Sequence, residues 1–552
     1  MNFDELVGQF VTDTTGAGGS LSAFGTELAL CLTILAILLL KIAMPRWRAS
    51  AFYVAVLGLM AAMFFLAMPA AGMVARNWFA MDAAAIPPAK AIFSGMLVSD
   101  SFTAGLRVLL LLFSLLFATF TQIAGAYDED DMAEFFVLML GALVGMCLMI
   151  AANHILIVML GIEMASVPSY VLAGMKRNQP KSSEAALKYA VFGAGTAGVM
   201  LYGMSLLVGV LGSAHVPTMT ARLAALFQDP GGITAGQTTV LVLGGLMLAV
   251  GLAFKLSAVP FHFWAPDVFE GTTAEVAAFL SVASKAAALG LLVRLASGFA
   301  FPSRLSLSAV MQPVEIGNTI AALAPARHYI VALISLLAAV TCTFGNLAAY
   351  GQTNMKRLLA YSTIAHAGYM MMPVAAAVSL LGTDPATARE AVAALVVYIA
   401  IYLFMNLSAF AIVAFLRNAI HSEEIADYGG LIRRSPFLTV CMAIVLFALV
   451  GLPPLAGFSG KFVAFYALVQ ANLLPLLFVG ILNTVLSLFY YLRVVRVMVF
   501  SPEPLYRQAP TIPLRSMVGS YCALLTLPVV LLFFMLSGLL HWANAAASAL
   551  FP

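Results

Sequence analysis

Charged side chains are scarce in this sequence. Asp, Glu, Lys and Arg make up 9% of its 552 residues, against about a quarter in a soluble domain. Apolar residues make up 63%, and this composition excludes an ordinary soluble enzyme. The 27 basic and 24 acidic residues give a net charge of +3, which is too balanced for a nucleic-acid-binding protein.

Cysteine is also rare. The five cysteines are scattered through apolar runs with no Cys-x-x-Cys pair, so the sequence predicts neither a disulfide framework nor a zinc or iron–sulfur site. It also lacks a glycine-rich dinucleotide fingerprint, a phosphate-binding P-loop and a histidine pair placed to hold haem. We therefore expect no cofactor and no metal in this chain.

Long apolar runs are what the sequence has in abundance. A helix that crosses a bilayer needs roughly 20 mostly apolar residues, and unsatisfied backbone is so costly in lipid that such runs should be helical. Fourteen runs lie near residues 21–41, 50–70, 103–123, 133–152, 154–175, 185–212, 237–258, 274–298, 329–350, 357–381, 391–416, 436–456, 472–500 and 515–541. The chain is predicted to be an all-α polytopic membrane protein in contact with the lipid bilayer.

The distribution of basic residues predicts the orientation of the chain. No basic segment precedes the first run, so we expect no cleaved signal peptide. With the N-terminus outside, loops after odd-numbered helices hold fifteen Lys and Arg residues, and the other loops hold six. Because short cytoplasmic loops collect Lys and Arg, both termini are predicted to face the periplasm or its equivalent.

The remaining basic residues lie within helices or at helix ends. They are Arg107, Lys188, Lys255, Lys285, Arg294 and Lys461. Intramembrane charge is costly, so a lysine there is a functional candidate. Arg107 and Arg294 lie near helix ends, where a long side chain can reach the interface, and we expect structural roles for both. Lys285 lies about eleven residues into its run, too deep to do the same.

Two further ionisable residues lie in the apolar runs. Glu163 is the only acidic residue predicted to be comparably deep. An unpaired carboxylate there would be neutral, so a lysine partner is expected. A helical histidine such as His366 is usually a satisfied core residue, but its position between a basic loop and Lys461 makes a relay role an equal alternative. Tyr402 and Tyr490 are candidates for polar lining.

Two helices are predicted to be broken beside a lysine. Pro260 follows Lys255 by five residues. Pro453 and Pro454, together with three glycines, lie in the ten residues before Lys461. Proline removes a backbone donor and clashes with the preceding helical turn. Such breaks are typical of transporters, although packing relief alone is the alternative.

The two lysines are predicted to meet opposite helix ends. Lys255 should lie at the C-terminal end of a half-helix, whose partial negative charge favours the cation. Lys461 should open a new half-helix, whose positive end disfavours the cation. The sequence therefore predicts that Lys461 loses its proton more easily than Lys255.

The two breaks also predict an internal repeat. They fall in helices seven and twelve, and because five is odd, helices 4–8 and 9–13 would be copies inserted with opposite orientation. The expected domains are residues 1–132 with helices 1–3, residues 133–298 with the first repeat, residues 299–500 with the second repeat, and residues 501–552 with the last helix.

Four segments of the chain form long motifs. They are Ser182-Ser-Glu184-Ala-Ala-Leu-Lys188-Tyr189, Phe254-Lys255-Leu-Ser-Ala-Val-Pro260-Phe-His262-Phe-Trp264-Ala-Pro-Asp267-Val-Phe-Glu270-Gly271, Lys356-Arg357-Leu-Leu-Ala-Tyr361-Ser-Thr-Ile-Ala-His366-Ala-Gly368-Tyr369 and Gly451-Leu-Pro-Pro-Leu-Ala-Gly457-Phe-Ser-Gly-Lys461-Phe462. In this order they resemble the antiporter-like membrane subunits of respiratory complex I. The Asp-Val-Phe-Glu-Gly form and the lysine at 461 are more similar to subunit N of bacterial NADH-quinone oxidoreductase than to its L and M relatives. The resemblance covers about residues 20–500.

The resemblance implies a proton-translocating subunit in the bacterial inner membrane. The chain would be a non-redox part of the enzyme, coupling quinone reduction elsewhere in the complex to proton pumping. Flavin, iron–sulfur clusters and quinone would be held by partner subunits, among them adjacent antiporter-like and quinone-site membrane subunits. The implied relay is Glu163 with Lys188 or Lys255, then Lys285, then Lys461. We add His366 as a candidate because it lies between a basic loop and Lys461.

Two other functions fit the residues. A subunit of a multisubunit sodium/proton antiporter shares this architecture, and a scaffold would use its buried charges only to set helix packing. One departure from the family pattern concerns the start of helix eight. Thr272-Thr-Ala-Glu275 stands where the family usually shows Ala-Pro-Thr-Pro. The sequence leaves open whether Glu275 joins a proton-uptake path or favours a helix N-terminus.

The absence of any residue constellation for an electron carrier makes a prediction. The purified subunit alone is expected to show no flavin, haem or iron absorbance, because redox chemistry belongs to its partners. Absorption spectroscopy and metal analysis of the isolated chain check this, and a stoichiometric cofactor signal would contradict it.

Overall fold

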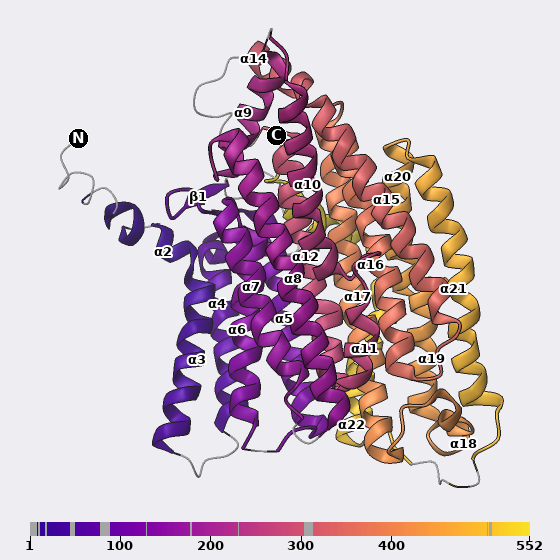
Figure 1. Cartoon of the computed structure of the whole chain (residues 1–552). Coiled ribbons are helices and arrows are strands. Elements are labelled where there is room, and N and C mark those ends of the chain that lie inside the picture. The colour runs from indigo at the N-terminus through magenta and orange to yellow at the C-terminus, as the bar shows by residue number, and fades with distance from the viewer. Residues whose placement is uncertain are drawn as a thin grey trace.

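The protein is described by a computed structural model. It covers residues 8, 11–16, 19–44, 50–77, 89–128, 130–176, 179–229, 231–302, 313–504, 506 and 511–551. Within these residues the structure is almost entirely helical, with one two-stranded sheet (Figure 1). Twelve of the described helices are long and apolar enough to cross a membrane, and two shorter apolar helices lie at Ala51–Ala67 and Pro436–Val450. The predicted all-α membrane fold is confirmed.

The elements follow one another in four groups. The first contains α2 (Ser20–Ala23), α3 (Gly25–Ala43), α4 (Ser50–Asn77), β1 (Lys90–Ile92), β2 (Leu97–Ser99) and α5 (Ser101–Ala124). The second contains α6 (Met132–Ala151), α7 (Ile155–Ala173), α8 (Pro180–Leu211), α9 (Val216–Gln228), α10 (Ala235–Leu256), α11 (Trp264–Gly271) and α12 (Ala274–Ala300). The third contains α14 (Pro313–Ala322), α15 (Ala324–Ala349), α16 (Met355–Leu380), α17 (Pro385–Ile420), the 3-10 helix η2 (Ile425–Tyr428), α18 (Leu431–Arg434), α19 (Pro436–Val450), α20 (Ala456–Gln470) and α21 (Leu474–Phe500). The fourth contains α22 (Met517–Phe534) and α23 (Leu536–Ala547).

The spanning helices begin and end at two opposite ends of the bundle. At one of them, which we call the basic end, Asn418 Nδ2 donates to the Ala124 carbonyl at 2.7 Å. At the other, the terminal end, β-bridges join Leu97 to Ala152 and His154 to His215. The basic end is the lower end of Figure 1, where α3 ends and α19 begins. The short helix α2 and the last described residues of the chain both lie toward the terminal end (Figure 1).

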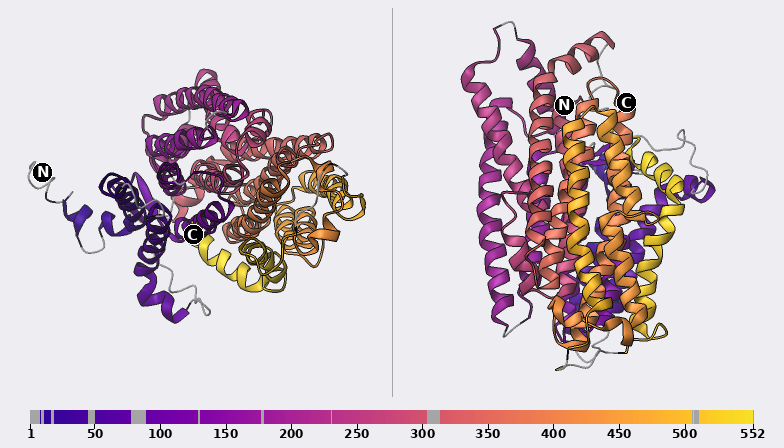
Figure 2. Two further views of the ribbon diagram at one scale, coloured as in Figure 1. Left: turned by 90° about the horizontal axis from the view of Figure 1, so that it is seen from below. Right: turned by 90° about the vertical axis from the view of Figure 1, so that its right-hand side faces the viewer.

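The second and third groups run in opposite directions. In the second group α6, α8 and α12 begin at the basic end, whereas in the third group α15, α17 and α21 finish there (Figure 1). Viewed along the bundle, the two groups lie side by side, the second in magenta and the third in orange (Figure 2). The N-terminal helices flank the second group, and α22 and α23 pack against α17. The inverted arrangement of two five-helix segments therefore agrees with the predicted fold.

Both predicted helix breaks are present. α10 ends at Leu256 and α11 begins at Trp264, with Pro260 between them. α19 ends at Val450 and α20 begins at Ala456, with Pro453 and Pro454 between them. Each break leaves carbonyl groups at the end of the first half-helix without an intrahelical partner.

The second break depends on two glycines. Gly451 has a φ of +91°, a conformation that side chains with a Cβ rarely adopt. At Gly457 an added Cβ would lie 1.7 Å from the Ala448 carbonyl oxygen. The first turn of α20 therefore passes against the last turn of α19 at a distance that only glycine allows.

Several short elements were not predicted. The hairpin of β1 and β2, the helix α9 and the helix α14 lie in segments that the sequence assigns to loops, because they are short and less apolar than the spans. The predicted fourteenth helix is divided at Met535 into α22 and α23. These differences leave the order of the spanning helices unchanged.

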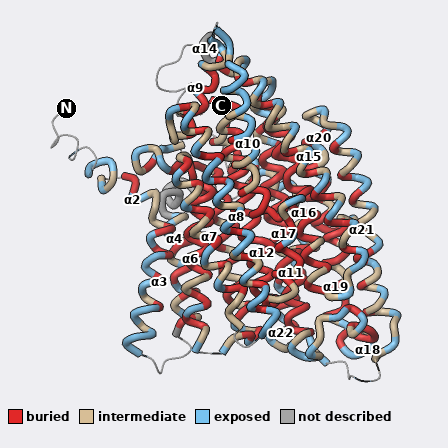
Figure 3. The backbone as a smooth tube through the Cα atoms, in the orientation of Figure 1, coloured by how far each residue is buried: buried red, intermediate tan, exposed pale blue. Residues whose placement is uncertain are grey.

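The core of the bundle is formed by α12, α16 and α17. Nearly all residues in the central apolar stretch of each of these three helices are buried (Figure 3). α12 can be surrounded because alanines cover much of its surface, so neighbouring backbones approach closely. Small residues are the usual means of close helix packing in membranes. The deepest predicted lysine, Lys285, lies on this helix.

Two intramembrane arginines are held in buried ion pairs. Arg107 is 3% exposed and lies 2.5 Å from Glu27 on α3, which is fully buried. Arg294 donates to Asp100 at 2.5 Å and to Thr103 at 2.6 Å. Neither arginine extends to the interface, and the ion pairs that hold them agree with the structural roles expected for both. Each joins two helices through a buried ion pair.

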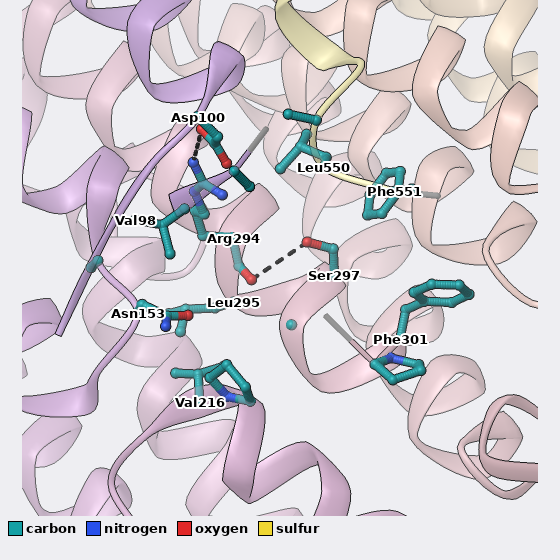
Figure 4. Close-up of a pocket in the computed structure, with 16 residues that line it drawn as sticks. Val98, Asp100, Asn153, Val216, Arg294, Leu295, Ser297, Phe301, Leu550 and Phe551 are labelled. Carbon is teal, nitrogen blue, oxygen red and sulfur yellow. Dashed lines mark hydrogen bonds and ion pairs between the residues drawn. The ribbon is translucent and has the colours of Figure 1, made fainter. Parts of the chain in front are cut away.

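The Asp100–Arg294 pair, at the terminal end, lines a small pocket (Figure 4). Asp100 caps the N-terminus of α5 by accepting from the Thr103 backbone. Burial by itself would raise the pKa of the Asp100 carboxyl, but the Arg294 guanidinium beside it holds the pKa below its usual range. The carboxylate thus stays charged and ties α5 to α12.

The Glu27–Arg107 pair predicts a double-mutant pattern. Glu27→Gln leaves an uncompensated buried arginine and is expected to destabilise the protein by roughly 3–5 kcal/mol. Combining Glu27→Gln with Arg107→Met removes both charges and is expected to recover most of that loss. Thermal unfolding of the detergent-solubilised protein measures both, and a double variant no more stable than the single one would contradict the pairing.

Candidate functional site

The first candidate group joins α7 and α10. Lys255, in the last turn of α10, is 1% exposed, and its Nζ donates to Ser166 Oγ at 3.0 Å. Glu163 lies three residues before Ser166 on α7 and interacts electrostatically with Lys255. Lys255 thus lies at the C-terminal end of its half-helix, as expected.

Glu163 lies near the middle of α7 and is half-buried. Glu27 and Glu275 are fully buried, but each lies in the first turn of its helix, so neither is as deep along its span as Glu163. The burial of Glu27 was not predicted, because a carboxylate so close to the start of a helix usually reaches water.

Lys188 lies in different surroundings. Its Nζ is 2.7 Å from Asp267 and 2.7 Å from Glu184, and its side chain is 36% exposed. Lys188 is therefore paired with these two carboxylates at the basic end. Of the two lysines proposed as partners of Glu163, Lys255 is the one that interacts with it electrostatically. Arg357 joins the same network through Asp267 and Glu270.

Lys285 lies at the centre of the bundle. It is 1% exposed, and its Nζ donates to the Thr363 carbonyl of α16 at 3.0 Å. Asn406 of α17 donates to Ser281 at 2.7 Å and approaches the Thr363 hydroxyl at 3.5 Å. The ammonium of Lys285 thus lies at the edge of a small polar cluster shared by α12, α16 and α17.

His366 lies on α16 between Lys285 and Lys461. Its Nδ1 is 3.0 Å from the Tyr398 hydroxyl, and its ring packs 5.1 Å from that of Tyr402. It interacts electrostatically with both lysines. The histidine therefore has the location that a relay residue requires, and it also has the satisfied packing of a core residue.

Lys461 binds the end of the preceding half-helix. Its Nζ donates to the carbonyls of Leu449 at 3.1 Å and Val450 at 2.8 Å, and it lies 4.4 Å from the centre of the Tyr369 ring. These carbonyls form the negative C-terminal end of α19. The prediction that Lys461 meets a positive helix end was wrong, because the side chain reaches back across the break. Lys255 and Lys461 therefore both meet helix C-termini.

Polar residues around these lysines were missed by sequence reasoning. Thr363, Ser281 and Asn406 link Lys285 to α16 and α17, and Asn346 accepts from Tyr490 at 3.0 Å. Tyr490 was predicted as lining. The available signal was a side-chain amide inside an apolar helix, which must find a partner in the interior.

The described residues form no group of three or more His, Cys, Asp or Glu side chains that would hold a metal. What they form is a set of lysines and one histidine, buried at membrane depth and bonded to neutral oxygen atoms. Such groups can bind and release protons, because burial weakens the charged form of lysine while carbonyl acceptors support it.

This arrangement defines the class of antiporter-like membrane subunits. Residues 152–487 match the family model described as NADH:quinone oxidoreductase/Mrp antiporter, transmembrane. NADH-quinone oxidoreductase subunit N of Anaeromyxobacter sp. is 37% identical over 471 residues, covering 83% of this chain and 86% of the relative. Subunit N of Rhodospirillum rubrum is 38% identical over 462 residues, covering 83% and 85%. The chain belongs to the family of NADH-quinone oxidoreductase subunit N, the antiporter-like membrane subunits of respiratory complex I.

Solved structures have the same fold. A chain of respiratory complex I from Thermus thermophilus with bound aureothin matches with a TM-score of 0.69 and 27% identity, covering 94% of this chain and 98% of that one. A chain of the Mrp complex from Dietzia sp. matches with a TM-score of 0.71 and 17% identity, covering 96% and 98%. The second likeness concerns the fold alone.

The position of Lys461 predicts the effect of its substitution. Lys461→Gln keeps donors for the two carbonyls, whereas an ionised Lys461→Glu would face them with no hydrogen to donate, at a cost of roughly 1–3 kcal/mol. The glutamate variant is expected to unfold at a lower temperature than the glutamine variant. Thermal unfolding of both, with Lys461→Met as the apolar control, tests this, and a glutamate variant as stable as the glutamine one would contradict it.

Proposed function

We propose that this chain translocates protons as a non-redox membrane subunit of NADH-quinone oxidoreductase. The single observation that supports the proposal is how two buried lysines, Lys285 and Lys461, are bonded. Within the described part of the chain, Lys285 and Lys461 form no ion pair, and their Nζ atoms bind only backbone carbonyls. Permanent buried charges are normally paired, so an unpaired lysine at membrane depth favours a group that changes its protonation.

The buried groups provide a path along the middle of the bundle. Glu163 and Lys255 lie at its first part, Lys285 at its centre, and His366 leads to Lys461. Moving a proton onto one lysine disfavours a second positive charge nearby, so the sites titrate as coupled groups. Quinone reduction in partner subunits would bias this switch through adjacent membrane subunits, while flavin, iron–sulfur clusters and quinone stay in those partners.

The relay fits the predicted orientation and domain division. We propose that the basic end faces the cytoplasm and both termini face the periplasm of a bacterial inner membrane. In this division residues 133–298 and 299–500 each supply one half of the path, and residues 1–132 and 501–552 flank them. Protons would be taken up at the basic end and released beyond Lys461.

The other two functions are less well supported. A sodium/proton antiporter subunit shares the fold, but the relatives at 36–39% identity carry quinone oxidoreductase names. A pure scaffold accounts for the Glu27–Arg107 and Asp100–Arg294 pairs, which join helices. It does not account for lysines without counter-ions at the centre.

Substitution of Lys285 tests the proposal. Lys285→Ala is expected to leave an assembled complex whose proton translocation and quinone reduction are reduced about tenfold or more, because a positioned proton-transfer group contributes at least this much. Lys285→Arg should not restore the rate, since arginine stays protonated. Proton uptake by sealed vesicles, normalised to assembled complex, measures the effect.

A matched control uses an exposed lysine. Lys41, whose side chain is 42% exposed, undergoes the same change to alanine far from the path and should pump like the unmodified protein. Normal pumping by both Lys285 variants would overturn the relay. Loss of assembly with normal pumping per assembled complex would favour the scaffold.

A further inference from the structure

A polar hollow opens at the basic end between the second and third groups. Its volume is about 490 Å³, and at roughly 30 Å³ for each liquid water it has room for more than ten. Its lining includes Lys181, Glu270, Thr273, Lys356, Arg417 and Glu423. Four of these form ion pairs with one another: Lys181 with Glu270, and Lys356 with Glu423.

Glu275 lies next to residues that line this hollow. It is the second residue of α12 and is fully buried, while Thr272 and Thr273, just before it, line the hollow. The Arg417 guanidinium is 3.6 Å away. Among the described residues, neither carboxylate oxygen of Glu275 has a hydrogen-bond partner.

Helix capping does not explain Glu275. Thr273 is the N-cap of α12, and its hydroxyl accepts from the Val276 backbone. The glutamate side chain makes no such bond. A buried carboxylate without hydrogen bonds is rare and calls for a water, an ion or a functional role, and the adjacent hollow supplies water.

The charged and titratable groups around Glu275 come from four segments. Arg417 lies on α17, Lys356 on α16, Tyr127 in the loop between α5 and α6, and Glu423 after α17. Lys356 is bound to Glu423 and to the Thr272 carbonyl. Arg417 is therefore the cation closest to Glu275, near enough to steady a carboxylate but not hydrogen-bonded to it.

A group of polar side chains lies between Glu275 and Lys285, beginning at Ser281. The two residues are ten positions apart on α12, about 15 Å at 1.5 Å per residue. Ser281 lies between them and accepts from Asn406, which approaches Thr363, whose carbonyl binds Lys285. Within the described part of the chain, Asn406 Oδ1 has no hydrogen-bond partner, so it can accept a hydrogen bond from water.

We propose that Glu275 takes protons from the hollow at the basic end and delivers them to Lys285. This inference rests on the proposed function. The carboxylate accepts a proton from water in the hollow and becomes neutral. It then passes the proton through water along Ser281 and Asn406 to the neutral amine of Lys285, which becomes an ammonium, and the carboxylate is restored beside Arg417.

The test compares two glutamates in the assembled complex. Glu275→Gln is expected to slow proton translocation about tenfold, with the loss largest at high pH, where free protons are scarcest. Glu270→Gln is the matched control, because Glu270 borders the same hollow but is held by Lys181 and Arg357. It should retain the rate and pH profile of the unmodified complex. Equal rates and pH profiles in both variants would overturn the inference.

A spectroscopic readout separates proton binding from a structural role. The redox-induced infrared difference spectrum of the complex should contain a carboxyl band that is lost in Glu275→Gln and kept in Glu270→Gln. If the glutamine variant does not assemble, Glu275→Asp decides, because the band must then change frequency. A band unaltered by both substitutions at 275 would contradict proton binding there.

The Lys285→Ala complex makes the two proposals distinguishable. If Lys285→Ala fails to pump and Glu275→Gln pumps normally, the relay stands and only the role of Glu275 is wrong. If Lys285→Ala pumps normally, the proposed function itself fails.

Discussion

The cost of placing charge in a lipid-surrounded core is the constraint on which the structure depends. The protein meets it in two ways. Toward the N-terminal helices and the terminal end, buried arginines are neutralised by carboxylates, as in Glu27–Arg107 and Asp100–Arg294. At the centre, lysines are bound by neutral oxygens, so their charge is supported without being fixed. The arginine–carboxylate pairs join helices, whereas the lysines bound by neutral oxygens can still exchange a proton.

The two broken helices supply part of that support. An intact helix consumes its own carbonyls, so a lysine beside it finds no acceptor. Ending α19 at Val450 frees two carbonyls, and the side chain of Lys461 returns across the break to bind them. The close passage of Gly457 against Ala448 keeps the two half-helices in contact, so the break presents acceptors without opening the bundle. Pro260 ends α10 just after Lys255, which binds the hydroxyl of Ser166 instead.

Much of the fold was predictable because apolar runs, prolines and charge asymmetry are properties of single segments. Runs of the right length located the spans, and Pro260, Pro453 and Pro454 located both breaks. Contacts between distant segments were harder to predict from the sequence. Glu27 and Arg107 are eighty residues apart, and neither segment contains a feature that indicates their pairing. The direction in which Lys461 reaches was also hidden, because its position at the start of α20 suggested the positive helix end while its long side chain spans the break.

The helix α17 carries a stripe of polar groups with a spacing of four residues. Tyr398, Tyr402 and Asn406 face His366 and Thr363 on α16, and Arg417 lies at the other end of the same unbroken 36-residue helix. A rotation by a single residue position, about 100°, would turn all three away from α16 together. Because one unbroken helix carries all three side chains, a rotation of α17 about its axis would break their contacts with α16 together and not one at a time.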